Sequence, residues 1–157
     1  MQPRMDNFAK IAAGGYRAMQ QVEAYLGHSG VPHSTLELMK IRASQINGCG
    51  FCLDMHYHAA KQAGESDERL YAIAGWREAP YYTAEERAAL ALTESMTRLA
   101  DSEGVPDHVW DDAADHYDEQ ALAALVMAAA QINAWNRINV TIRSVAGSHR
   151  HPTAATA

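Results

Sequence analysis

Apolar residues recur at steps of three and four residues along most of the chain, which is the spacing of amphipathic helices. Residues 6–26 show this spacing first. Gly14-Gly15 should interrupt that helix, because each glycine costs about 1 kcal/mol relative to alanine. No stretch alternates convincingly with a period of two residues, as a half-buried strand would. The pattern therefore predicts an all-α fold.

Capping residues, glycines and prolines predict the helix boundaries. Ser34 and Glu37 have the spacing of a capping box, and Asn47-Gly48 should end the helix that they begin. Later helices are expected over residues 49–62, 66–76, 83–104 with a second capping box at T-A-E-E, 106–116 and 118–147. We expect one single-domain bundle of about six to seven helices over residues 1–147, followed by a disordered tail at 148–157.

Composition and charge narrow the classes of partner. The 157 residues, 48% hydrophobic and 20% charged, suit one globular domain. A formal charge of −6 argues against nucleic acid and against an anionic membrane surface. No apolar run reaches the roughly 18 residues of a membrane span. The N-terminus lacks the apolar segment of a signal peptide, so we expect a cytoplasmic protein.

The candidate chemistry lies in one motif. The chain has two cysteines, Cys49 and Cys52, arranged as C-x-x-C, and His56 follows four residues later. If a helix begins here, the three side chains share one face. A thiol at a helix N-terminus, in C-x-x-C and beside an imidazole, has three reasons for a lowered pKa. Because the thiolate is the reactive form, the motif indicates redox chemistry.

With Glu37, the motif becomes E-x11-C-x2-C-x3-H, which resembles the active-site pattern of AhpD-like alkylhydroperoxidases in the carboxymuconolactone decarboxylase-like superfamily. The stretches H-Y-H-A-A-K-Q-A-G-E-S, T-A-E-E-R-A-A-L-A-L-T-E and A-W-N-R-I-N-V-T also resemble single-domain members. The resemblance covers roughly residues 20–147. Some members have a histidine between the cysteines, where this chain has Gly50-Phe51, so any proton relay through that histidine is absent.

The resemblance implies a thiol-dependent peroxidase with four site residues. Cys52 would attack the hydroperoxide and become a sulfenic acid, and Cys49 would resolve it to a disulfide. His56 would exchange the thiol proton, and Glu37 would orient His56 or relay the proton. An external thiol or dithiol protein would reduce the disulfide, and no metal or cofactor is implied. Single-domain members also form homo-oligomers, often trimers or hexamers.

Glu37 has two competing interpretations. Helical rise places it about 15 Å back from the turn and His56 about 11 Å beyond it. An antiparallel pair would leave an offset of about 4 Å, so we expect contact through a water rather than directly. Alternatively, the capping box with Ser34 occupies this carboxylate.

Other functions stay open at this stage. Cys49 and Cys52 could be inert core residues, or could bind structural zinc with His56 and Glu37. The C-x-x-C could serve a thiol–disulfide oxidoreductase or redox sensor, or the chain could be a lactone decarboxylase or an assembly module. Lactone decarboxylation does not need a redox cysteine pair, which argues against it.

The last helix bears on assembly. It is apolar around much of its circumference, and such a helix must bury more than one face. We therefore expect a neighbouring subunit; the alternative is a central core helix within one subunit.

Overall fold

The structure is a computed structural model in which residues 2–150 are described. Over these residues it consists of α-helices, two short 3-10 helices and loops, with no strand, which confirms the all-α prediction. None of the described helices combines the length and the apolar character that crossing a membrane requires.

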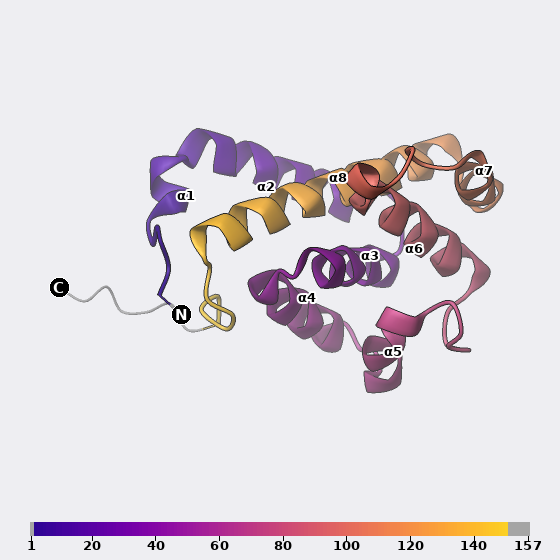
Figure 1. Ribbon diagram of the computed structural model, residues 1–157, viewed down its shortest axis with the longest axis horizontal. Helices are drawn as coiled ribbons and strands as arrows, with labels where there is room; N and C mark the ends of the chain where they lie inside the picture. The colour runs from indigo at the N-terminus through magenta and orange to yellow at the C-terminus, as the bar shows by residue number, and fades with distance from the viewer. Residues whose placement is uncertain (1, 151–157) are drawn as a thin grey trace.

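Eight α-helices make up the described part of the chain, one more than the upper predicted number (Figure 1). Their bounds are α1 Phe8–Ile11, α2 Ala13–Gly27, α3 His33–Asn47, α4 Gly50–Gln62, α5 Asp67–Ala72, α6 Ala84–Thr97, α7 Asp107–His116 and α8 Glu119–Ile142. The 3-10 helices are η1 Ile73–Gly75 and η2 Leu99–Asp101.

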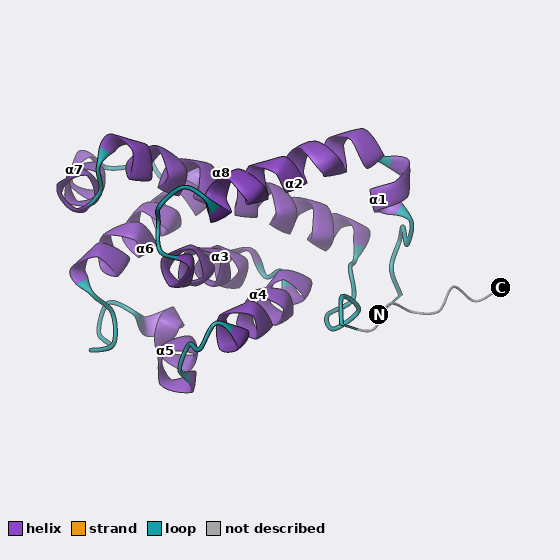
Figure 2. Cartoon of the chain, turned by 180° about the vertical axis from the view of Figure 1, so that it is seen from behind, coloured by secondary structure: helices purple, strands orange, loops and turns teal. Residues whose placement is uncertain are grey.

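Helix α3 is the centre of the bundle and packs against α4, α6 and α8. Helix α2 runs along α8 on one side, whereas α4 and α5 lie on the other side of α3 (Figures 1 and 2). Nine consecutive or nearly consecutive residues of α3 are buried, including the charged Glu37 and Lys40. A helix that is buried all round must satisfy its polar side chains internally, and these are the residues that form the site.

Several predicted boundaries are confirmed by the caps. Thr83 and Glu86 form the predicted capping box, with Thr83 Oγ1 accepting from Glu86 N at 3.2 Å and Glu86 Oε2 accepting from Thr83 N at 2.9 Å. Ser66 and Asp118 cap α5 and α8 as expected. Gly48 ends α3 in the left-handed conformation, with φ 67°.

Four predicted boundaries are wrong, and one of them is the end of α6, which comes at Thr97 and not at residue 104. The Ser34 capping box does not form, because α3 begins at His33 after Pro32 and has no side-chain cap. The first helix breaks at Ala12, whereas Gly14-Gly15 continue inside α2. Helix α8 ends at Ile142, because Arg143 adopts a left-handed conformation before Gly147 is reached.

The predicted tail overlaps only partly with the described chain. Residues 148–150 form turns, and Arg150 Nη2 donates to Asp54 Oδ1 at 3.0 Å. The rest of the predicted tail, residues 151–157, lies outside the described residues.

Candidate active site

The junction between α3 and α4 places the C-x-x-C motif at a helix N-terminus. Gly48 reverses the chain, and Cys49 N then donates to Ser44 O at 3.0 Å. Cys49 is the N-cap residue of α4, and its Sγ accepts from Cys52 N at 3.3 Å. Cys52 therefore lies in the first turn of α4, where the helix dipole favours negative charge.

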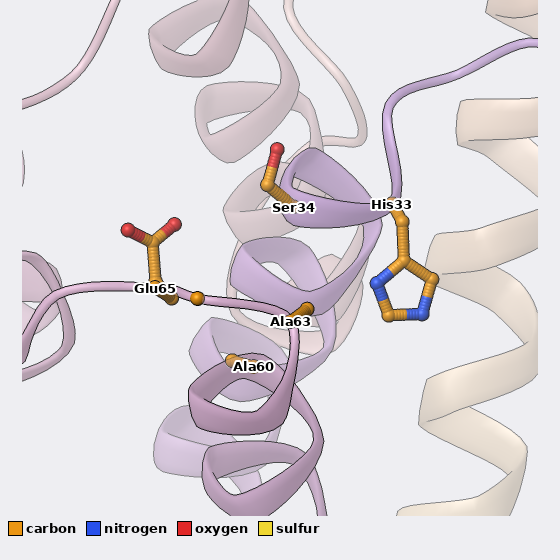
Figure 3. A pocket seen from close by; sticks show the side chains of 6 residues that line it. His33, Ser34, Ala60, Ala63 and Glu65 are labelled. Atoms are coloured by element: carbon orange, nitrogen blue, oxygen red, sulfur yellow. The ribbon is translucent and has the colours of Figure 1, made fainter.

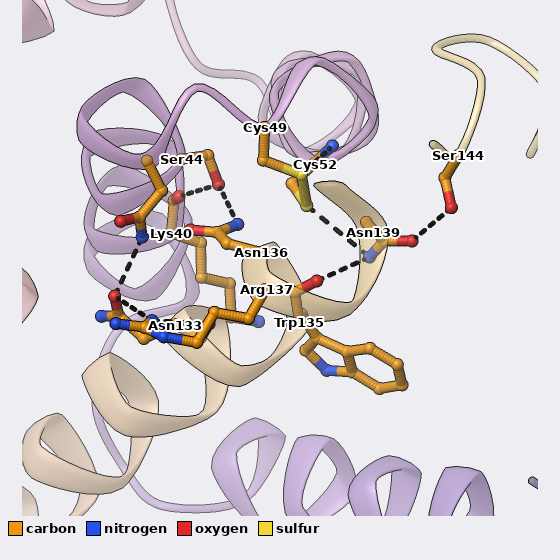
Figure 4. Close-up of a disulfide and its surroundings, with 11 residues drawn as sticks. Lys40, Ser44, Cys49, Cys52, Asn133, Trp135, Asn136, Arg137, Asn139 and Ser144 are labelled. Atoms are coloured by element: carbon orange, nitrogen blue, oxygen red, sulfur yellow. Dashed lines mark hydrogen bonds between the residues drawn. A yellow bond between two sulfur atoms is a disulfide. The ribbon is translucent and has the colours of Figure 1, made fainter. Parts of the chain in front are cut away.

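The two cysteines are joined in a disulfide, with their Cα atoms 5.4 Å apart (Figure 4). Both are buried, with Cys49 1% and Cys52 0% exposed. Ala43 and Ile132 complete this cluster, and the partly buried Phe51 and Trp135 pack against it. The sulfur atoms thus sit in a largely apolar environment.

His56 and Glu37 form a direct, buried pair. His56 Nδ1 lies 2.8 Å from Glu37 Oε2, and the two residues are 7% and 3% exposed. The predicted water-mediated contact is therefore wrong, because the estimate counted helical rise and left the reach of both side chains out of account. An ionised Glu37 fixes the proton of His56 on Nδ1, which leaves Nε2 as the nitrogen that can accept one.

Lys40 completes the electrostatics of Glu37. Lys40 Nζ donates to Glu37 Oε1 at 3.4 Å and to Glu23 Oε2 at 2.9 Å. Burial alone would raise the pKa of Glu37, but the His56 hydrogen bond and the electrostatic interactions with His56, Lys40 and His33 outweigh it. The pKa of Glu37 is thus held below its ordinary value of 4.5, and the carboxylate stays ionised at neutral pH.

Helix α8 supplies side chains that the sequence pattern did not single out. Trp135 Nε1 donates to Glu23 Oε1 at 2.9 Å. Because Glu23 also accepts from Lys40, this bond connects α8 to the ion pairs of Lys40 with Glu23 and Glu37. Asn139 Nδ2 lies 3.7 Å from Cys52 Sγ (Figure 4). The available signal was a polar stripe in an apolar helix, formed by Asn133, Asn136 and Asn139 at three-residue steps.

The zinc alternative has no support in this geometry. The Glu37 carboxylate, the fourth ligand that this alternative needs, is turned toward His56 and Lys40. Within residues 2–150, no three or more His, Cys, Asp or Glu side chains gather as metal ligands do.

A cavity of about 210 Å³ lies at the other end of the α3–α4 pair (Figure 3). It is lined by residues from the start of α3 and the end of α4, namely His33, Ser34, Ala60, Ala63, Gly64 and Glu65. His33 is exposed, and its Nε2 lies 3.9 Å from Glu37 Oε1. The cavity therefore lies beside His33, which approaches Glu37, and does not include either sulfur.

Comparison with known proteins places this site in a family context. The family model described as "Carboxymuconolactone decarboxylase family" matches residues 13–95, which include Glu37, both cysteines and His56. The chain is 42% identical over 142 residues to the uncharacterized protein YdfG of Bacillus subtilis, covering 90% of this chain and 96% of that one.

Two further relatives carry AhpD in their descriptions. Alkyl hydroperoxide reductase AhpD of Methylobacterium sp. strain 4-46 is 38% identical over 69 residues, covering 44% of this chain and only 39% of the relative. The crystal structure of an Agrobacterium tumefaciens protein of unknown function, suggested to be an antioxidant defence protein AhpD, superposes with a TM-score of 0.87 and 34% identity. That match covers 92% of this chain and 98% of the other.

Proposed function

The chain belongs to the carboxymuconolactone decarboxylase family, and we propose that it is an AhpD-like, thiol-dependent peroxidase that reduces organic hydroperoxides. The observation that carries the proposal is that a disulfide and a histidine–glutamate pair lie together in one buried site. A Cys49–Cys52 disulfide sits at the N-terminus of α4, and His56, one turn beyond Cys52 on the same helix, pairs with Glu37 of α3.

Cys52 is the proposed nucleophile. Its thiolate attacks one oxygen of the hydroperoxide, the O–O bond breaks, and the alkoxide leaves with a proton as an alcohol. Cys52 is then a sulfenic acid. The proposed role of His56, whose Nδ1 contacts Glu37, is to take the thiol proton on Nε2 and return it to the leaving oxygen.

Cys49 is the proposed resolving residue. Its thiolate attacks the Cys52 sulfur, the S–O bond breaks, and the hydroxyl leaves as water after protonation. The product is the disulfide seen in the structure. An external thiol or dithiol protein supplies two electrons and two protons to restore both thiols, as a reducing cytoplasm would allow.

The surroundings of the sulfurs favour an organic substrate. Ala43, Ile132, Phe51 and Trp135 line the cysteines with apolar atoms. Entry of an alkyl group into this environment is favourable, whereas hydrogen peroxide would have to be desolvated without that gain. We therefore expect faster oxidation by an organic hydroperoxide, such as cumene hydroperoxide, than by hydrogen peroxide.

Single-cysteine variants test the assignment. Cys52→Ser should abolish hydroperoxide turnover. Cys49→Ser should react once and trap a sulfenic acid that dimedone labels, because the nucleophile remains and the resolving thiol is gone. Intact mass of the wild type should fall by two hydrogens on treatment with hydroperoxide.

The outcomes separate the proposed function from its rivals. Dimedone labelling of Cys52→Ser instead of Cys49→Ser would reverse the two roles. Wild-type protein that resists organic hydroperoxides, but is oxidised by a protein disulfide, would replace the peroxidase by a thiol–disulfide oxidoreductase or redox sensor.

A further inference from the structure

We propose that Asn139 is a catalytic residue whose side-chain amide donates a hydrogen bond to the sulfur of Cys52 and stabilises its thiolate. The contact is a distance of 3.7 Å between Asn139 Nδ2 and Cys52 Sγ, across the interface of α8 and α4. The catalytic meaning of this contact rests on the proposed function, whereas the stabilised thiolate can be measured without any peroxide.

The orientation of the Asn139 amide is fixed by its other partners (Figure 4). Asn139 Nδ2 donates to the backbone oxygen of Trp135 at 3.0 Å, and only the nitrogen end of an amide can donate to a carbonyl. At the opposite end, Asn139 Oδ1 accepts from Ser144 Oγ at 2.7 Å. The remaining N–H of the amide therefore points at sulfur.

The C-terminus of α8 holds this amide in place. Arg143 ends the helix in a left-handed conformation with φ 59°, and Ser144 N donates to Asn139 O at 2.9 Å. The same turn that caps α8 thus brings the Ser144 hydroxyl onto the Asn139 side chain. A side chain that is held by both of its ends loses little further entropy when it binds a thiolate.

Apart from His56, which becomes a cationic donor when it takes the thiol proton, a thiolate at Cys52 has few other donors. The backbone N–H of Cys52 already bonds Cys49 Sγ, and the neighbouring side chains Phe51, Ile132 and Trp135 present mainly apolar atoms. Hydrogen bonds to a charged group are stronger than those between neutral groups, most of all where water is excluded. Asn139 therefore donates to the thiolate a hydrogen bond that water, which is excluded here, cannot donate.

The same N–H acts in both halves of the proposed cycle. In the oxidative half it favours the Cys52 thiolate over the thiol before attack on the hydroperoxide. In the reductive half an external thiolate attacks Cys49 Sγ, and the S–S bond breaks. The electron pair passes to Cys52, where Asn139 stabilises the leaving thiolate.

The test is the thiolate titration of Cys52 in a Cys49→Ser background, where it is the only thiol. The absorbance at about 240 nm measures the thiolate fraction as a function of pH. Asn139→Leu keeps the size of the side chain without a donor, and Asn139→Ala provides a second variant if leucine prevents folding. Val140→Ala, at an exposed position in the same turn, is the matched control.

Loss of a charge-assisted hydrogen bond should raise the pKa of Cys52 by about one unit or more, while Val140→Ala leaves it unchanged. In Asn139 variants that keep both cysteines, the equilibrium constant for reducing the disulfide should fall about tenfold at a pH above the thiol pKa. This change equals a fall of about 30 mV in the reduction potential. A purely structural Asn139 would instead lower the melting temperature without moving the titration.

An unchanged thiolate titration in either folded Asn139 variant would overturn the inference. This outcome differs from failure of the proposed function, in which the wild type does not reduce hydroperoxides whatever the Cys52 titration shows. A raised pKa with an unaltered rate of peroxide reduction at a pH where Cys52 is fully ionised would confine Asn139 to thiolate formation, as the inference requires.

Discussion

Cys49 caps α4 and is also the proposed resolving residue. Its sulfur bonds Cys52 in the disulfide and also accepts the backbone N–H of Cys52 as the N-cap of α4. Serine is among the preferred N-cap residues, so Cys49→Ser keeps this cap while removing the thiol. The variant that traps the sulfenic acid is therefore also the one that least disturbs the helix carrying Cys52.

Lys40 is predicted to keep Glu37 ionised. Lys40→Met removes the ammonium group between Glu37 and Glu23, so burial of Glu37 is opposed by fewer positive charges and its pKa rises. Because Glu37 then remains buried without its ammonium partner, the free energy of unfolding should fall by about 3 kcal/mol at pH 7. Urea denaturation at pH 7 and at pH 4 measures this cost.

The pH dependence of that cost follows from the sign of the shift. In the wild type the folded pKa of Glu37 lies below 4.5, so its contribution to stability is present above that value and lost as pH falls through the folded pKa. The cost of Lys40→Met should therefore shrink at acid pH. Lys61→Met, which breaks an exposed pair with Asp67, is the control and should change little. An equal cost of Lys40→Met at both pH values would contradict the role of Lys40.

Some site residues could be predicted from sequence and others could not. Cys49, Cys52 and His56 lie on one helix, where spacing alone puts them on one face. Asn139 reaches the site only through the packing of α8 against α4, and Glu23, the second partner of Lys40, comes from α2. Local periodicity carries no information on such contacts between elements.

At the scale of elements, local signals competed with tertiary contacts. Thr83-Ala-Glu-Glu86 and Ser34-Thr-Leu-Glu37 have the same spacing, yet only the first forms a capping box. Glu86 lies in the first turn of α6, where it reaches back to Thr83 and also accepts from Arg69. Glu37 is instead buried between α3 and α4, where His56 and Lys40 are better partners for a carboxylate than an exposed backbone N–H.

Gly48 is predicted to be necessary for the α3–α4 junction. Its φ of 67° is left-handed, so Gly48→Ala should lower the free energy of unfolding by about 1 kcal/mol even though a methyl group meets no atom there. Gly50→Ala, two residues later inside α4, meets no atom either and has no positive φ. That control should be neutral or stabilising, because alanine favours the helix.

Urea denaturation of Gly48→Ala and Gly50→Ala, with hydroperoxide turnover measured beside it, checks this pair. The left-handed turn at Gly48 sets the direction in which the chain leaves α3, and so the position of Cys49. Gly48→Ala should therefore also reduce turnover, whereas Gly50→Ala should not. Equal stability of the two variants would show that the left-handed turn is not under strain.

At the scale of the molecule, a buried amide layer sets the position of the helices around the site. Asn47 Nδ2 donates to Asn133 Oδ1 and Asn136 Oδ1, each at 2.9 Å, and Asn136 Nδ2 donates to Ser44 Oγ at 3.0 Å. These bonds join α3 to α8, and Figure 4 shows Ser44 and Asn136 in the surroundings of the disulfide. Because buried polar groups must be satisfied, the layer fixes the register in which Asn139 meets Cys52.

The last prediction concerns assembly. Helix α8 packs within the chain against α2, α3, α4, α6 and α7, and most of its apolar residues are covered there. The apolar circumference of α8 therefore does not by itself require a second subunit. Other apolar groups are left uncovered, however. Helix α1 buries none of its residues, and Ile11 is 66% exposed, with Met127 41% exposed on α8.

We expect these exposed groups to be covered by other copies of the chain, because apolar surface of this kind marks interaction sites. Light scattering coupled to size exclusion should then give a multiple of 17.2 kDa at micromolar concentration. Ile11→Glu should shift the mass toward the monomer, because association would bury an unpaired charge. Gln21→Glu, which adds the same charge at an exposed position of α2, should not. A wild-type mass of one chain would contradict the prediction, and an unchanged multiple in Ile11→Glu would exclude α1 from the interface.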